Sequence, residues 1–314
     1  MRVVLAGRIE ILSKQDFEIS YHECLRVTIV QWHRYHSREH SLSRNSRILA
    51  TMPQMGFLPL PGDHITFEKP KPAEWTIVAK LSQEVYQNDE IDVQDGAGPS
   101  YAVATFRVYS GLDGQEAYMR IYLQVPHKGT RCIPPNERAK QAAAGYHSEV
   151  EAMKAFYEQG STITPTLLAI SEDIQDKQGI IPGGYVIHCV FQRVPGLRPA
   201  DDNISPEYRP TPHKFFLAFD KPEQDHIRMV FDKEYRELNK LGWVPNFPRP
   251  MGLIWDSDVS KLYFVDFRDA REVRDQEMGD DDGEKRRHIL WRSWGLAIAS
   301  DKRWDEVDLS KWKL

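Results

Sequence analysis

This chain contains no long apolar run. None of its hydrophobic stretches approaches the roughly 20 residues that a membrane-spanning helix requires. The amino-terminal segment MRVVLAGRIEILSK has only a short apolar core followed by Glu10, which is unlike a secretory signal. We therefore predict no membrane association and a cytoplasmic location.

Cysteines and glycine-rich loops are also scarce. The three cysteines, Cys24, Cys132 and Cys189, lack the spacing of a zinc site and cannot all pair within the chain, which favours a reducing compartment. A GxG pair at Gly96 and Gly98 lies beside acidic residues that would repel a phosphate group. The sequence thus predicts no metal site and no glycine-rich nucleotide loop.

The composition is that of a globular protein. Hydrophobic residues make up 41% of the 314 positions, charged residues make up 28%, and eight tryptophans occur. A formal net charge of -5 gives no overall reason to expect a nucleic-acid partner, although a local basic patch can still bind one. The length fits one bilobal unit or two small domains.

Hydrophobic periodicity predicts strands in the first half of the chain and helices further on. Residues 75–86, 101–109 and 117–125 have strand patterns, and the turn from Gly111 to Gly114 predicts a hairpin between the second and third. The segments TPTLLAI and GGYVIHCVFQRVPG are expected to form the next strands. Helical spacing predicts helices over residues 137–159 and 223–240.

Residues 241–270, LGWVPNFPRPMGLIWDSDVSKLYFVDFRDA, resemble the catalytic core of protein kinases and aminoglycoside-phosphotransferase-like kinases. In this resemblance Asp266 has the metal-binding position of a hydrophobic-Asp-Phe turn. Arg120, in the third predicted strand, takes the place of the lysine that holds nucleotide phosphates, and Glu149 is its expected helical partner.

Three positions in the same region depart from the kinase pattern. Pro245 stands at the histidine position, Phe247 at the catalytic aspartate and Gly252 at the metal-binding asparagine. Phosphoryl transfer needs a carboxylate that orients the attacking hydroxyl and ligands that hold magnesium. Ordinary ATP-dependent kinase activity is therefore not expected.

The resemblance implies an α+β fold, bilobal and protein-kinase-like, with an antiparallel-sheet small lobe and a trimmed helical large lobe. Residues 1–70 would form an extension of strand and helix with a basic-aromatic segment. Residues 71–195 would form the small lobe, and residues 196–314 would form a reduced large lobe with a tryptophan-rich tail.

In overall character the chain is similar to the fungal arginine-containing cyclodipeptide synthases of secondary metabolism. That similarity implies a transferase that uses aminoacyl-tRNA, needs no cofactor and holds a small amino-acid-like ligand in the cleft between the lobes. One alternative is a catalytically inactive pseudokinase that acts as a binding or scaffold module. A third possibility is an atypical small-molecule phosphotransferase.

Carboxylates that no longer hold magnesium can bind a guanidinium or an α-amine through charge-assisted hydrogen bonds. The candidate catalytic residues are Asp266, Glu149 and Arg120. The candidate substrate-binding residues are Asp269, Arg268, His188 and Tyr118. Because His188 lies in an apolar strand, a core position is the competing interpretation for it.

A basic-aromatic run at residues 31–47, QWHRYHSREHSLSRNSR, could contact the tRNA backbone or could be a solvated helix face without a partner. The candidate RNA-binding residues are Arg34, Arg38, Arg44 and Arg47, with Lys285, Arg286 and Arg287 as a second basic segment. His33, His36 and His40 have helical spacing, but without a nearby cysteine or acidic ligand they are expected to be surface residues rather than metal ligands.

Overall fold

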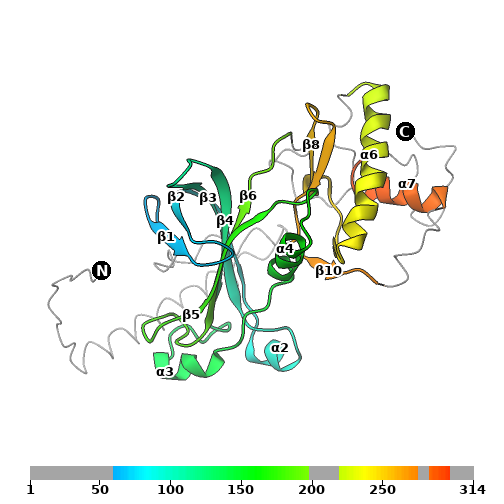
Figure 1. Ribbon diagram of the computed structural model, residues 1–314. Helices are drawn as coiled ribbons and strands as arrows, with labels where there is room; N and C mark the ends of the chain where they lie inside the picture. The colour runs from blue at the N-terminus through cyan, green and yellow to red at the C-terminus, as the bar shows by residue number, and fades with distance from the viewer. Residues whose placement is uncertain (1–58, 198–218, 275–282, 298–314) are drawn as a thin grey trace, which may run out of the picture.

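The computed structural model describes residues 59–197, 219–274 and 283–297 (Figure 1). The run at residues 31–47 lies outside these ranges, so the predictions for Arg34, Arg38, Arg44, Arg47 and the three histidines concern residues that the structure does not describe. The described helices include no candidate for a membrane span.

An antiparallel six-stranded sheet in the order β1-β2-β3-β4-β6-β5 forms the first part of the described chain. Its strands are β1 (His64–Phe67), β2 (Ala73–Tyr86), β3 (Tyr101–Ser110), β4 (Glu116–Gln124), β5 (Leu167–Ile174) and β6 (Tyr185–Gln192). The strands predicted from periodicity, and the hairpin between β3 and β4, are confirmed.

The sheet curls until its two edges nearly meet. β2 contains register shifts between Ile77 and Ala79 and between Lys80 and Ser82, and such irregularities increase the local twist and bend of a strand. A bridge from Lys69 to Ile170 then links the chain just after β1 to β5, at the opposite edge of the sheet. The result is an almost closed, barrel-like sheet.

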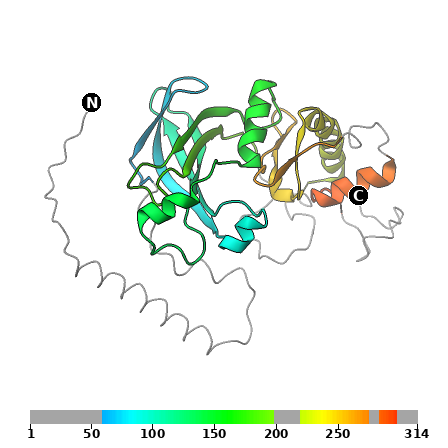
Figure 2. The ribbon, with the colours of Figure 1, turned by 90° about the horizontal axis from the view of Figure 1, so that it is seen from below.

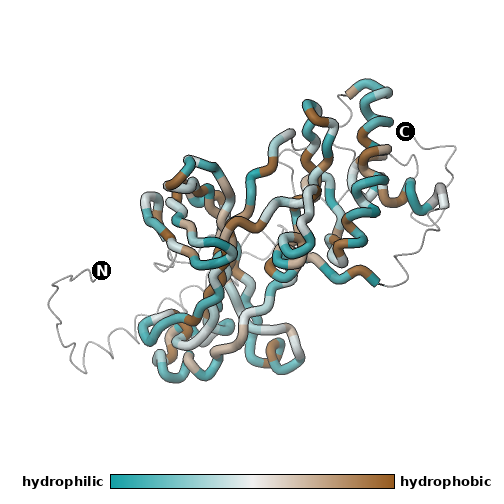
Figure 3. The backbone as a smooth tube through the Cα atoms, viewed as in Figure 1, coloured by the Kyte–Doolittle hydropathy of each residue, from teal (hydrophilic) through white to brown (hydrophobic). Residues whose placement is uncertain are grey.

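Alternating side chains fill the inside of this barrel-like sheet. Successive strand residues point to opposite faces, so a period-2 sequence buries one face and leaves the other for different contacts. The buried interior contains Phe106 and Met119 from neighbouring strands, together with Trp75 and Phe67. Figure 3 shows hydrophobic colouring along the central strands, whereas α6 (Lys221–Lys240) alternates between hydrophilic and hydrophobic positions.

Short helices connect and cover the sheet. These are α2 (Glu90–Gln94), α3 (Pro135–Arg138), the 3-10 helix η1 (Ala139–Gln141) and α4 (Ser148–Glu158). The prediction of one helix over residues 137–159 is wrong for its first half, because α4 begins only at Ser148. A Cβ atom on Gly145 would lie 2.7 Å from Cγ of Tyr185, so the chain before α4 passes too close to β6 for a continuous, side-chain-bearing helix.

The described residues of the C-terminal part form two small two-stranded sheets and two longer helices. Its elements are α6, β7 (Trp243–Pro245), the 3-10 helix η2 (Pro250–Gly252), β8 (Leu253–Asp256), β9 (Lys261–Phe264), β10 (Ala270–Glu272) and α7 (Glu284–Ser293). β8 pairs with β9, and β7 pairs with β10. In Figures 1 and 2, α4 lies between the barrel-like sheet and these elements.

The expected bilobal protein-kinase-like fold with a helical large lobe is therefore wrong. The described chain is mostly antiparallel sheet, and its first unit is an almost closed barrel rather than an open small-lobe sheet. In the described C-terminal part, residues 241–274 form paired short strands instead of a helical platform. Local motifs resembled a kinase, but strand pairing between residues far apart in sequence decided the architecture.

α6 does form as predicted, for reasons that are local. Asp220 accepts a hydrogen bond from the backbone N–H of Glu223 at 2.9 Å, which caps the first turn. Ile227, Phe231 and Leu238 then share a buried face and pack on the strands of the C-terminal part. This packing helps to hold β8 and β9 in place.

Candidate ligand-binding cleft

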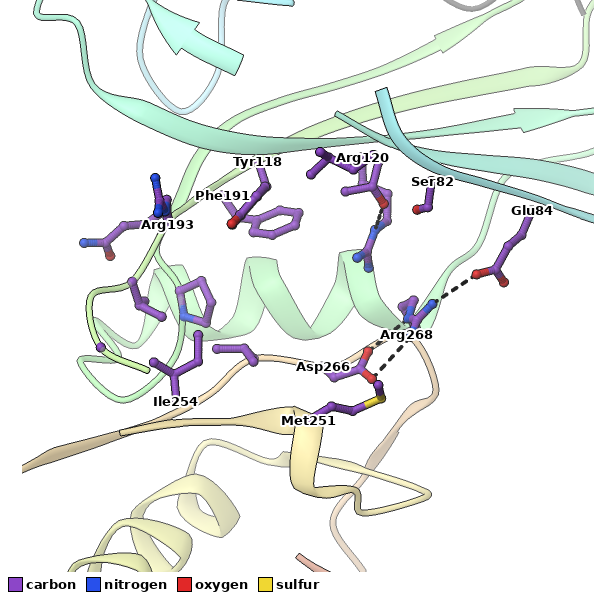
Figure 4. Close-up of a pocket in the computed structure, with 17 residues that line it drawn as sticks. Ser82, Glu84, Tyr118, Arg120, Phe191, Arg193, Met251, Ile254, Asp266 and Arg268 are labelled. Carbon is purple, nitrogen blue, oxygen red and sulfur yellow. Dashed lines mark hydrogen bonds and ion pairs between the residues drawn. The ribbon is translucent and has the colours of Figure 1, made fainter. Parts of the chain in front are cut away.

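A cleft of about 860 Å³ lies between the outer face of the barrel-like sheet and the chain around β8 and β9 (Figure 4). This volume is within the usual range for small-molecule sites. The residues that line it are Leu81, Ser82, Glu84, Thr105, Tyr118, Arg120, Pro165, Phe191, Gln192, Arg193, Val194, Gly196, Met251, Ile254, Val265, Asp266 and Arg268. Of the candidate site residues, four are brought together here: Asp266, Arg120, Arg268 and Tyr118.

Arg120 reaches the cleft because of strand parity. Its neighbours in β4, Met119 and Ile121, point into the barrel, so Arg120 and Tyr118 point out toward the cleft. The guanidinium Nε of Arg120 donates to Oγ1 of Thr105 at 3.3 Å, and its plane lies over the ring of Phe191, 5.5 Å from the ring centre. Thr105 and Phe191 thus hold Arg120 from two sides.

Glu149, the predicted partner of Arg120, lies directly behind it. The carboxylate forms an ion pair with the Arg120 guanidinium and accepts a hydrogen bond from the hydroxyl of Tyr122. Burial alone would lower the pKa of Arg120, but the charge of Glu149 raises it, so the guanidinium stays charged. Burial and then the charge of Glu149 raise the pKa of Tyr122 well above its ordinary value, so its hydroxyl keeps the proton that it donates.

Asp266 forms the opposite wall of the cleft. The next residue, Phe267, is buried against Phe156 of α4, with ring centres 4.7 Å apart, and the N–H of Val265 donates to the carbonyl of Gly252 at 2.9 Å. These contacts fix the backbone on both sides of Asp266. The sequence prediction that Asp266 follows a buried strand is confirmed by β9.

Arg268 links Asp266 to the barrel-like sheet. Its Nε donates to Oδ1 of Asp266 at 3.0 Å, and its NH1 lies 3.4 Å from Oε1 of Glu84 in β2. Burial would raise the pKa of Asp266, but the hydrogen bonds and charge of Arg268, and then the charge of Arg120, lower it below its ordinary value. Asp266 is therefore a carboxylate at any physiological pH.

Sequence reasoning missed most of the residues that line the cleft, among them Glu84, Phe191 and Arg193. Phe191 stacks at an angle on Tyr118, with ring centres 6.0 Å apart, and Arg193 forms an ion pair with Glu116 at the mouth of the cleft. Nothing in the local sequence of β2 distinguishes Glu84 from its exposed neighbours.

Two predicted substrate-binding residues do not line the cleft. Asp269 pairs instead with Arg249, with its Oδ2 3.3 Å from NH2 of that arginine. Cys189 pairs with Arg120 in the sheet and so shares its face, whereas the neighbouring residue, His188, points to the opposite face. There the centre of the His188 ring lies 6.4 Å from the centre of the Phe67 ring. Burial lowers the pKa of His188, so it is neutral there, in agreement with the core interpretation.

None of the three positions that depart from the kinase pattern lines the cleft, although Gly252 lies beside Asp266. Pro245 belongs to β7 and pairs with Ala270, and the side chain of Phe247 is exposed. Gly252 lies under Trp294: a Cβ atom there would be 3.0 Å from the indole ring. An asparagine at this position would have to push the indole aside.

The second basic segment lies on α7, beyond α6 from the barrel-like sheet (Figure 1). Arg286 is exposed, whereas Arg287 lies 3.5 Å from a carboxylate oxygen of Asp232 in α6. Lys285 belongs to the same helix, and neither Arg286 nor Arg287 lines the cleft. Within the described residues, no three His, Cys, Asp or Glu side chains are grouped as metal ligands would be.

The cleft can hold a small polar ligand through fixed charges. Among its described lining residues, those with shifted pKa values are Arg120, Asp266 and Arg268, and all three shift toward their charged forms. The hydroxyls of Ser82, Thr105 and Tyr118 add neutral hydrogen-bonding groups.

No protein-family model matches the chain, and no curated protein is significantly similar to it.

Proposed function

We propose that the cleft binds an arginine-derived substrate and that the protein is a transferase that joins arginine to a second amino acid as a cyclic dipeptide, using aminoacyl-tRNA. The observation that carries this proposal is the ionised carboxylate of Asp266 in a cleft of about 860 Å³, facing the charged guanidinium of Arg120. A carboxylate of this kind suits a guanidinium or ammonium group.

The proposed chemistry needs no cofactor. Each α-amine attacks the ester carbonyl of the other aminoacyl group, so two amide bonds form, two ester bonds break and two tRNA molecules leave. Asp266 would hold a cationic group of the substrate. Arg120, which the carboxylate of Glu149 keeps charged despite its burial, would stabilise the negative oxygen that develops at the attacked carbonyl.

A binding module without chemistry is the second candidate, and one specific observation favours it. The charged groups of the cleft have partners within the protein: Arg120 has Glu149, Arg268 has Asp266, and Arg193 has Glu116. Each pair is already neutral overall. Such a cleft can recognise a ligand without activating it.

Product formation separates these two functions. The purified protein, incubated with arginyl-tRNA and a mixture of other aminoacyl-tRNAs, is expected to release an arginine-containing cyclic dipeptide, detected by mass spectrometry. Ribonuclease treatment before incubation should remove the product, and adding ATP should not increase it. Binding of L-arginine amide without any product would favour the binding module, and absence of both would contradict each function.

Binding of tRNA is expected to depend steeply on salt, because each neutralised phosphate releases condensed counterions. Replacing Arg34, Arg38, Arg44 and Arg47 with glutamine should weaken tRNA binding and reduce the slope of log K against log salt by about one for each phosphate that is no longer neutralised. Fluorescence anisotropy with labelled tRNA between low and physiological salt measures both effects.

A matched control removes exposed charge elsewhere. Lys128 and Arg131 lie in an exposed turn far along the chain from the basic-aromatic run, and their replacement with glutamine should leave the salt slope unchanged. An unchanged slope in the fourfold variant would instead move the RNA surface to Lys285, Arg286 and Arg287. No tRNA binding by the wild type at low salt would exclude the tRNA-dependent reaction.

A further inference from the structure

One guanidinium in the cleft is shared by two carboxylates from distant parts of the chain. Arg268 reaches Asp266 through Nε at 3.0 Å and NH2 at 3.4 Å, and it reaches Glu84 through NH1 at 3.4 Å (Figure 4). Asp266 follows β9, whereas Glu84 lies in β2, 184 residues away from Arg268. Arg268 therefore spans the cleft between the C-terminal part and the barrel-like sheet.

This arrangement is that of a guanidinium-binding site with an occupant. Two oxygens of Asp266 receive two N–H groups of the same guanidinium, the fork geometry that distinguishes arginine from lysine. Glu84 faces a third nitrogen of the same guanidinium from the other wall. We propose that Asp266 and Glu84 recognise the guanidinium of an arginine-like ligand, and that Arg268 occupies this site until the ligand displaces it. This inference rests on the proposed function, because it names the group that the cleft selects.

Arg268 is held loosely enough to be displaced. Its side chain is 39% exposed and that of Glu84 is 44% exposed, and two of the three contacts are as long as 3.4 Å. Ion pairs that water can reach contribute little, typically below about 1 kcal/mol. The side chain of Asp266 is only 17% exposed, so it stays in the cleft and needs a cation there at all times.

Exchange of one guanidinium for another preserves the charge of the site. The incoming ligand would take over the contacts to Asp266 and Glu84, and Arg268 would move into solvent, where a guanidinium is well hydrated. Because Arg268 competes with the ligand for the same oxygens, the apparent affinity equals the intrinsic affinity multiplied by the fraction of molecules in which the site is open. Removal of Arg268 should therefore strengthen binding.

The test uses L-arginine amide, which has a guanidinium but no carboxylate, and L-citrulline amide, its neutral ureido counterpart. Isothermal titration calorimetry with Arg268→Met should show an affinity for L-arginine amide roughly three- to tenfold higher than that of the wild type. Affinity for L-citrulline amide should not rise. Arg268→Lys keeps the positive charge but lacks the paired N–H groups of a guanidinium. Its affinity for L-arginine amide should therefore fall between those of the wild type and Arg268→Met.

Two further variants control for general effects. Glu84→Gln together with Arg268→Met should lose the gain, whereas Arg131→Met, in an exposed turn outside the cleft, should match the wild type. Weaker or unchanged binding of L-arginine amide by both Arg268 variants would overturn this inference, even if the protein still made the cyclic dipeptide. If the wild type and all variants neither bound L-arginine amide nor made product, the proposed function would fail as well.

Discussion

Asp266→Asn is expected to abolish formation of the cyclic dipeptide and to weaken binding of L-arginine amide more than any other single change in the cleft. Asparagine keeps the size of the side chain but removes the charge that pairs with a cation. Loss of one partner from a largely desolvated charge pair costs about 2–5 kcal/mol, which corresponds to a loss of roughly 30-fold to more than a thousandfold in affinity. Calorimetry and the product assay measure the two losses separately.

The matched control for this change is Asp258→Asn. Asp258 lies in the exposed turn between β8 and β9, and Asp266 follows the end of β9. The Asp258→Asn protein should bind L-arginine amide and form the cyclic dipeptide like the wild type. Wild-type behaviour of a folded Asp266→Asn protein would rule out a role for this carboxylate in the cleft.

The pH dependence of the wild type follows from the same carboxylate. Because Arg268 depresses the pKa of Asp266 below its ordinary value, the stabilisation that this group gives the folded state is complete above its unfolded pKa. That stabilisation is lost only as the pH falls through the folded pKa. Titration of Asp266 should therefore cause no loss of affinity for L-arginine amide between pH 8 and about pH 5.

Glu149→Gln is expected to have the largest effect on stability. The side chains of Arg120 and Glu149 are 13% and 5% exposed, so the change leaves a buried guanidinium without its counter-charge. Breaking a buried pair in this way costs about 3–5 kcal/mol. A protein of this size should then melt roughly 6–20 °C lower, as measured by scanning calorimetry or circular dichroism.

Two control variants test whether the loss of stability comes from the buried ion pair. Glu151→Gln alters the same helix, but Glu151 pairs with Lys154 at the surface, so the cost should stay below about 1 kcal/mol. Changing both Arg120 and Glu149 to methionine removes both charges together and should recover most of the stability while binding of a carbonyl-bearing substrate is lost. A Glu149→Gln protein that melted like the wild type would show that this pair does not hold α4 against β4.

The two groups that carry these predictions differ in how well the sequence foretold them. Asp266 was visible because it follows four apolar or aromatic residues and precedes Phe267, a pattern that buries the flanks and leaves the carboxylate at an edge. The pairing of Arg120 with Glu149 was suggested only by resemblance to kinases, and the structure brings the two together although the expected kinase-like fold is wrong.

By itself the sequence determined the elements whose causes are local. The period-2 pattern of residues 101–109 and 117–125 and the turn between them specify β3 and β4, and the cap at Asp220 with an apolar face specifies α6. The same strand parity determined that Tyr118 and Arg120 share a face. These features depend on neighbours within a few residues, which a single sequence displays.

Only the tertiary structure decided how those elements meet. Closure of the sheet through the bridge from Lys69 to Ile170, the start of α4 after Gly145, and the contact of Arg268 with Glu84 each join segments that are separated by many residues. The side chain of His188 does not face the cleft, because the register of β6 against β4 places Cys189, not His188, beside Arg120. A shift of one residue in register exchanges the two faces of a strand, and the packing of the whole sheet, rather than any local pattern, sets that register.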